Sequence, residues 1–194
     1  MIHDSVPVAL RATSEPQPTL SSSMASEPWF VLYVKPRHEK HVSRILCGKG
    51  YEAFLPLYER RTSCRVTELP LFPSYVFCRL DPANRLPVLS VPGVFSIVGI
   101  GGTMAPVNPT EIAALQLIMR SGLDRDPWPA LPCGTPVTVI RGPMQGISGV
   151  VIRNKTSTRI LVSVTLLQRS VSVELHRSWL KDEVSELAAG SEQS

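Results

Sequence analysis

The side chains best placed for chemistry are the cations that follow the first apolar run of the chain. Arg37, His41 and Arg44 recur at the i, i+4, i+7 spacing of one helical face, with Lys40 beside them and Lys35 just before. Glu39 is the one acid counted on this face, and a helical face with so little counter-charge suits the phosphate backbone of nucleic acid. An ordinary solvated face is the open alternative, because exposed helical faces are commonly charged. We favour a helix that faces nucleic acid.

Catalytic and metal-binding patterns are both missing from the sequence. It contains no G-x-S-x-G elbow, no Walker loop and no H-E-x-x-H pair, and its carboxylates are scattered. His38 and His41, taken with Cys47 or Cys64, match no standard zinc framework, although a zinc site is the alternative to plain surface histidines. We therefore expect no enzymatic activity, no cofactor and no metal.

The stretch 69–77 (LPLFPSYVF) concentrates aromatic residues and prolines in a chain that is otherwise poor in aromatics. Pro73 cannot donate to a sheet ladder, so a turn is predicted to feed a strand that begins at Ser74. Side chains alternate along a strand, which places Tyr75 with Phe77 on one face and Val76 with Cys78 on the other. Phe72 is assigned to neither face. It is interpreted either as a plug for the sheet edge or as an aromatic anchor for a partner.

Composition is that of an ordinary globular protein with a mild basic excess. The 194 residues are 43% hydrophobic and 19% charged, with a formal net charge of +4. The four cysteines, one of them Cys133, have irregular spacings without a C-x-x-C pair, and no signal-peptide core opens the chain. No apolar run approaches the length of a membrane span. We expect a cytoplasmic monomer with free thiols and no membrane association.

The elements that would position these residues predict an α+β domain over residues 28–123. Residues 29–34 are apolar throughout and indicate a buried central strand, and residues 39–48 carry a helical pattern. Further strands are predicted near 51–58 and 94–98, with a polar, basic hairpin tip at 59–65. A last helix is expected to start at Asn108 and Pro109. The simplest arrangement is an antiparallel or mixed sheet covered by helices.

The remaining sequence predicts a second, all-β domain. Residues 124–132 are proline-dense and are interpreted as a semi-rigid linker. Short runs rich in Val, Ile and Thr then recur about every ten residues across 133–184, which is typical of a small barrel. The composition of residues 1–27 and 185–194 predicts disordered tails, and Met24 is an alternative to Met1 as the start.

Several of these motifs, in this order, resemble the NusG family of transcription elongation factors over residues 28–182. Residues 29–33 and 39–42 resemble the first strand and helix of the family's N-terminal (NGN) domain, and 71–77 resembles its central signature. Pro92-Gly93-Val94 resembles the next turn, and residues 134–151 are similar to the KOW motif. The resemblance implies an NGN sheet flanked by helices, linked to a small SH3-like KOW barrel. Independently of it, Gly142, Gly146 and Gly149 are expected to permit tight, positive-φ turns.

The family resemblance also implies a function. Its N-terminal domain is expected to sit on the clamp helices of RNA polymerase, so that the elongation complex resists pausing and termination. Carried over by position, the polymerase-binding residues are Tyr33, Phe72, Pro73, Tyr75, Asn84 and Arg85. The basic helix, with Lys35, Arg37, Lys40, His41 and Arg44, is then expected near upstream or non-template DNA.

Two departures from the family pattern bear on partners and targets. The tip 165–169 lacks the aromatic residue through which general members dock on the ribosome or on Rho, which leaves Leu166 and Leu167 as the KOW contact. Residues 35–37 and 71–75 look closer to specialised paralogues that act on long polysaccharide or secondary-metabolite operons. The β-branched density of residues 136–174 argues against a KOW domain that refolds into helices.

A KOW-containing RNA-binding or ribosome-associated protein is the competing interpretation, because such barrels also bind RNA by shape and phosphate contacts. A ribosomal protein would not need an aromatic pocket in a preceding domain. Its net charge would also normally be far higher than +4.

Overall fold

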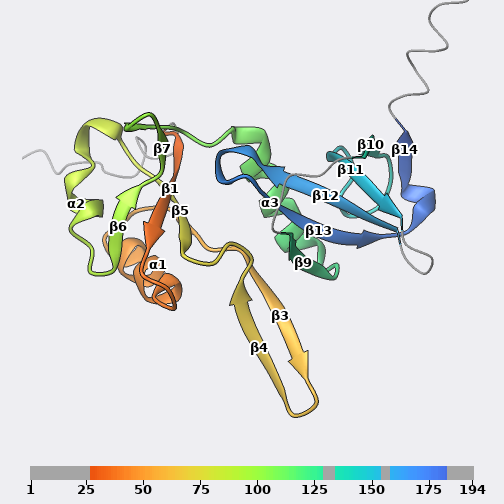
Figure 1. Cartoon of the computed structure of the whole chain (residues 1–194), viewed down its shortest axis with the longest axis horizontal. Coiled ribbons are helices and arrows are strands. Elements are labelled where there is room, and N and C mark those ends of the chain that lie inside the picture. Colours follow the sequence, from red (N-terminus) through yellow and green to blue (C-terminus); the bar gives the residue numbers. More distant parts are fainter. Residues whose placement is uncertain (1–26, 129–133, 154–157, 183–194) are drawn as a thin grey trace, which may run out of the picture.

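Strand β1 (Trp29–Val34) lies at the centre of an antiparallel sheet in the N-terminal domain, as its unbroken apolar run predicts (Figure 1). The computed structural model describes residues 27–128, 134–153 and 158–182. The four strands of this sheet follow the order β2-β5-β1-β6. The other three are β2 (Ala53–Phe54), β5 (Tyr75–Arg79) and β6 (Val94–Ile97).

Helices cover both faces of this sheet. On one face α1 (Glu39–Gly48) and α2 (Leu86–Leu89) bury Val42, Leu46 and Val88 against Val76 and Cys78. On the other face α3 (Pro109–Ser121) contributes its buried aliphatic side chains to the cluster that contains Phe77. The predicted alternation along β5 is therefore confirmed, since odd and even positions enter different cores.

Two small hairpins complete the N-terminal domain. Strands β3 (Leu57–Thr62) and β4 (Arg65–Pro70) form a ribbon that stands out from both domains (Figure 1). Strands β7 (Gly99–Ile100) and β8 (Thr103–Met104) form the second, shorter hairpin. A 3-10 turn at Pro82–Asn84 precedes α2, and the Asp81 side chain accepts the Ala83 N–H at 2.8 Å at its start.

The C-terminal domain is a six-stranded antiparallel sheet with the order β14-β10-β11-β12-β13-β9. Its strands are β9 (Arg125–Trp128), β10 (Thr135–Val139), β11 (Ser148–Arg153), β12 (Thr158–Val164), β13 (Arg169–Leu175) and β14 (Leu180–Asp182). Single 3-10 turns lie at Thr165–Leu167 and Arg177–Trp179. The expected fold class, an α+β domain followed by an all-β KOW-like domain, is confirmed.

Part of the stretch that we expected to be a linker is a strand. Residues 125–128 pair with β13, Arg125 opposite Val173 and Trp128 opposite Ser170. Pro127 is tolerated there because β9 is the outermost strand of the sheet, where a missing N–H need not break a ladder. The expectations for residues 1–26, 129–133 and 183–194, including the tails, Met24 and Cys133, fall outside the described residues.

Two KOW glycines are required for different reasons. Gly142 has φ +84°, and a Cβ there would lie 2.7 Å from the Trp179 ring. Gly149 does not have the positive φ that we expected. A Cβ at Gly149 would instead lie 2.7 Å from the Leu161 carbonyl oxygen on the neighbouring strand. Glycine at 149 therefore permits close approach of two backbones and not a left-handed turn.

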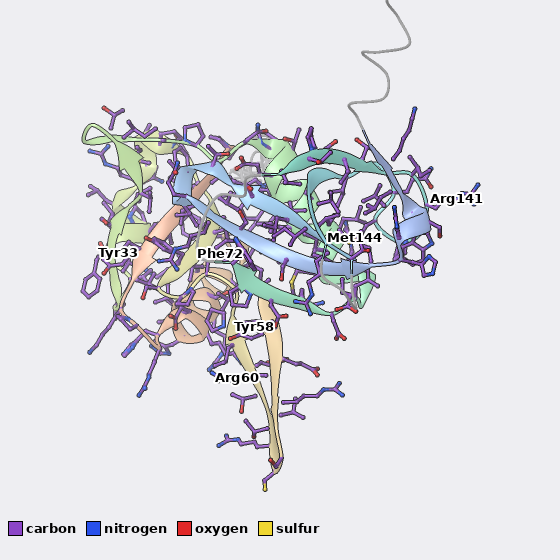
Figure 2. The ribbon with its side chains drawn as sticks, turned by 45° about the vertical axis from the view of Figure 1, so that its right-hand side comes forward. Tyr33, Tyr58, Arg60, Phe72, Arg141 and Met144 are labelled. Atoms are coloured by element: carbon purple, nitrogen blue, oxygen red, sulfur yellow. The ribbon has the colours of Figure 1, made fainter. Side chains whose placement is uncertain are left out.

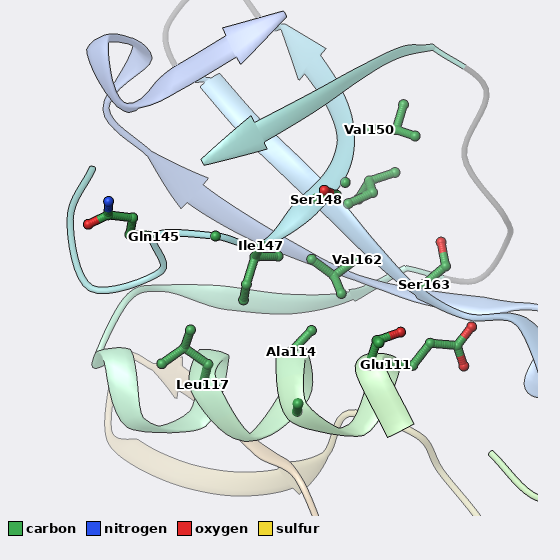
Figure 3. Close-up of a pocket in the computed structure, with 14 residues that line it drawn as sticks. Glu111, Ala114, Leu117, Gln145, Ile147, Ser148, Val150, Val162 and Ser163 are labelled. Atoms are coloured by element: carbon green, nitrogen blue, oxygen red, sulfur yellow. The ribbon is translucent and has the colours of Figure 1, made fainter. Parts of the chain in front are cut away.

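The two domains share one apolar cluster. Phe77 and Ile112 from the N-terminal domain belong to the same buried set as Ile147 and Val162 from the C-terminal sheet. A cavity of about 790 Å³ lies between α3 and strands β11 and β12 (Figure 3). Among the described residues that line it, Glu111 is the one ionisable side chain. Its lining thus offers apolar contact and no catalytic group beyond a single carboxylate.

Candidate functional site

Tyr33 and Tyr75 lie side by side at one end of the N-terminal sheet, directly opposite each other in the β1–β5 register. Their ring centroids are 5.8 Å apart, and Phe95 from β6 lies 5.6 Å from Tyr33. Tyr33 is 41% exposed and Phe95 59% exposed, and Figure 2 shows Tyr33 pointing away from the body of the molecule. We call Tyr33, Tyr75 and Phe95 the aromatic cluster. It is a solvent-open surface of the kind that binds apolar side chains of a partner.

The turn before Tyr75 is held by a buried carboxylate. Ser74 has φ +69°, a conformation that non-glycine residues adopt at a cost. Its N–H donates to Glu39 Oε1 at 2.9 Å, and its carbonyl accepts the Val34 N–H at 2.9 Å. Glu39 is only 5% exposed, so this charge-assisted hydrogen bond is sheltered from water. Helix α1 thereby fixes where Tyr75 begins its strand.

Phe72 is buried and does not form part of an open surface. It is 1% exposed and packs edge-on against Phe77, with ring centroids 5.7 Å apart. Of the two interpretations of Phe72, its burial favours the plug for the sheet edge over the exposed aromatic anchor. Pro73 next to it is exposed, so the turn itself is accessible. The pocket expected from Tyr33, Phe72, Pro73 and Tyr75 is therefore shallower than predicted, because Phe72 does not line it.

Residues of the C-terminal domain reach this region. The Arg169 guanidinium lies 5.7 Å from the centre of the Tyr75 ring, within the range of a cation–π contact. Thr165 donates to Glu111 Oε1 of α3 from its N–H at 3.2 Å and from its hydroxyl at 2.7 Å. One side of the aromatic cluster is therefore covered by the second domain.

The KOW tip is turned toward the N-terminal domain, which bears on its expected partner contact. Leu167 is 9% exposed and belongs to the shared apolar cluster, and Leu166 packs against that cluster. In this arrangement both leucines contribute to packing within the chain. Nothing in the sequence near residues 165–167 indicates Glu111 as a partner, because the two segments are 54 residues apart.

The five basic residues at and before α1 are exposed as predicted, but one of them makes an ion pair. Lys35, Arg37, Lys40, His41 and Arg44 are all exposed. Lys40 Nζ lies 3.0 Å from Glu68 Oε2 on β4, so its charge is already matched. Glu39, which seemed to be the acid of this face, is buried on the opposite side. Arg37 lies in the turn before α1 and has φ +66°, so it does not continue the helical face of His41 and Arg44 that the spacing predicted. The exposed guanidinium groups of Arg37 and Arg44 are nevertheless available at this surface.

Metal binding finds no support in the described part of the chain. No group of three potential ligands comes together there, and the His38 and His41 rings are 6.4 Å apart at their centroids. Cys47 and Cys64 are free and exposed. None of the described helices is long and apolar enough to cross a membrane.

Asn84 and Arg85 are exposed at the start of α2. Arg85 Nη1 lies 3.7 Å from Met104 Sδ, a weak contact that leaves most of the guanidinium free. Leu86 beside them is 72% exposed, a large apolar side chain that sequence reasoning did not single out. Phe95 was also missed as a site residue. Alternation along the strand after Pro92-Gly93 could not have found it, because the β1–β6 register shifts between Tyr33 and Val34, where Phe95 has no directly opposite partner.

Comparisons with known proteins agree with this architecture. Residues 27–116 match the family model described as "Transcription termination factor nusG". The structure is similar to that of "Domain interaction in Thermotoga maritima NusG", with 20% identity, a TM-score of 0.53, and coverage of 82% of this chain and 99% of that one. A second match, "Crystal Structure of MjSpt4:Spt5 complex conformation B", has 15% identity over 80% of this chain and 96% of that one; its TM-score of 0.27 is too low to support an argument. No curated protein matches the sequence.

Proposed function

We propose that the chain is a transcription factor of the NusG family and that its N-terminal domain, which the family model matches over residues 27–116, binds the clamp helices of RNA polymerase. Bound there, it suppresses pausing or termination during elongation. The observation that carries the proposal is the aromatic cluster, in which Tyr33 and Phe95 expose ring surface beside Tyr75. Aromatic rings at a rigid sheet end bury large apolar area at little entropic cost.

The contact surface follows from the exposed residues of the site. Tyr33, Pro73 and Tyr75 provide direct contacts, with Phe95 added to them. Phe72 is buried and packs against Phe77, which lies two residues after Tyr75 in the same strand. Asn84 and Arg85 present a second, polar surface at the start of α2 for another part of the polymerase. The C-terminal domain recruits a further component of the transcription or translation machinery, such as Rho or the ribosome.

The proposed setting is a dedicated long operon, such as a polysaccharide or secondary-metabolite cluster. Support for it is the similarity of residues 35–37 and 71–75 to specialised paralogues. The exposed cations of α1 and of the turn before it then lie along upstream or non-template DNA.

Retention of RNA polymerase on the immobilised full chain tests this proposal. Changing Tyr33→Ala should weaken binding by roughly 30-fold or more, as expected for an interface hot spot of about 2 kcal/mol. Trp128→Ala is the matched control, because Trp128 is an aromatic residue of similar exposure, 38%, on the C-terminal sheet. Equal retention by the Tyr33 variant and the wild type would contradict the proposal. Co-sedimentation with ribosomal subunits without polymerase retention would favour the ribosome-associated alternative.

A further inference from the structure

The β3–β4 hairpin is an arm with its own anchorage and two free faces. Each strand has six residues, so the ribbon extends for roughly 20 Å at the usual rise per residue. Its strands pair with each other and with no other described strand. The base is tied down by two hydrogen bonds, from Leu71 N–H to the Pro56 carbonyl at 2.9 Å and from Arg125 Nε to the Leu57 carbonyl at 3.0 Å. An isolated ribbon is marginal in water, and this anchorage helps to hold it.

One face of the arm is electrically balanced. Glu59 and Glu68 are directly opposite each other in the register, which would be repulsive if both were unpaired. Arg61 from the same strand lies 3.2 Å from Glu59, and Lys40 from α1 lies 3.0 Å from Glu68. Each carboxylate on this face thus has a cation, and no net charge remains there.

The other face is cationic without compensation. Directly opposite residues share a face, so Arg60 with Thr67 and Thr62 with Arg65 lie on the same side of the ribbon. Arg60 and Arg65 are exposed, and neither makes an ion pair with any described residue. Figure 2 shows Arg60 on the hairpin, away from the body of either domain. Beyond Tyr58 and Leu69 at the base, this face carries only guanidinium and hydroxyl groups.

The side chains of this face favour nucleic acid over protein as its partner. Protein interfaces are built on an apolar or aromatic centre, which the outer part of the face does not have. Guanidinium groups bind phosphates and guanine edges in pairs of hydrogen bonds, and threonine hydroxyls contact phosphates or bases. A two-stranded ribbon is also the width that the major groove of duplex DNA admits. We propose that the Arg60–Arg65 face of the β3–β4 arm binds duplex DNA.

Duplex binding by the purified full chain, without polymerase, tests the arm independently of the proposed function. Fluorescence anisotropy with a labelled random-sequence duplex is measured across a salt titration. Arg60→Ala and Arg65→Ala should each lower the slope of log affinity against log salt by about 1, and the double variant should bind roughly fivefold to tenfold more weakly at low salt. The Thr62 hydroxyl donates to the backbone carbonyl of residue 65, so Arg65→Ala keeps the turn intact.

Arg61→Ala is the matched control, because it removes the same charge from the same strand on the balanced face. It should leave the salt slope unchanged. An equal effect of Arg60→Ala and Arg61→Ala would overturn the proposal, since it would show a diffuse dependence on net charge. Equal losses on single-stranded DNA or on RNA of the same length would overturn the assignment to duplex DNA. Unchanged thermal unfolding of all three variants confirms that the arm remains folded.

Discussion

Single residues show where alternation along a strand is a reliable guide and where it fails. The faces of residues 75–78 followed from the period of two, and both cores are built accordingly. Phe72 precedes strand β5, so the alternation of side chains along the strand could not assign it to a face. Its position against Phe77 comes from the structure alone. The sequence predicted Glu39 to be a surface acid because its partner, the Ser74 N–H, is 35 residues away and no local pattern indicates it.

The thiol of Cys78 gives a prediction at this scale. Burial raises the pKa of Cys78 to about 12, with smaller contributions from Cys47, Glu27 and Glu52. The unfolded chain ionises this thiol from a pKa of 9.0, whereas the folded chain keeps it neutral. Its contribution to stability is therefore complete below pH 9 and is lost as the pH rises toward 12. We expect the free energy of unfolding to fall by on the order of 1 kcal/mol per pH unit in this range.

Urea unfolding of the wild type and of Cys78→Ala at several alkaline pH values checks this. The variant should be less stable at neutral pH, because it leaves a small cavity, but its stability should decline less steeply as the pH rises above 9. Cys64→Ala, at the exposed hairpin tip, should keep the wild-type slope. Parallel pH profiles for wild type and Cys78→Ala would refute the assignment.

At the scale of elements, the sequence predicted helices and strands well because each carries its own period and caps. Helix α3 begins where expected, with the Asn108 side chain accepting the Thr110 N–H at 3.0 Å. Contacts between elements were not predictable in this way. Lys40 belongs to the cationic pattern of α1, yet it pairs with Glu68, 28 residues further along. Periodicity says which side of a helix is polar but not what faces it.

The basic surface formed by α1 and the turn before it leads to a second electrostatic prediction. Changing Arg37 and Arg44 together to Ala should weaken binding to nucleic acid and lower its salt slope by about 2, while polymerase retention is spared. Lys40→Ala is the internal control, since its ammonium already contacts Glu68 and should contribute less. The measurement is a salt titration of DNA affinity for the three proteins. A slope that does not change in the double variant would rule out this role for α1.

At the scale of the whole molecule, the domains pack against each other through Glu111 with Thr165 and through Arg169 with Tyr75. The sequence gives no sign of this contact, because each pair joins segments that are far apart and individually ordinary. The arrangement covers one side of the aromatic cluster. A partner that needs the whole Tyr75 ring must therefore compete with the C-terminal domain.

Removing the Glu111 carboxylate should loosen that contact. Glu111→Ala deletes the acceptor of two hydrogen bonds, and we expect faster hydrogen exchange in α3 and in the turn Thr165–Leu167. Glu174→Ala is the control, because its ion pair with Arg159 lies within the C-terminal sheet. Exchange rates in α3 that match the wild type would show that the apolar cluster alone holds the domains together.

Because residues 125–128 form a strand of the second sheet, they limit where the chain can be cut to express the C-terminal domain alone. An expression product that starts at residue 133 would lack β9 and leave the outer edge of β13 unpaired from Ser170 to Val173. Open edges of this kind recruit strands from other molecules, so such a fragment is prone to self-association. A C-terminal fragment that starts at or before residue 124 keeps all six strands of the sheet and also contains the proline-dense segment.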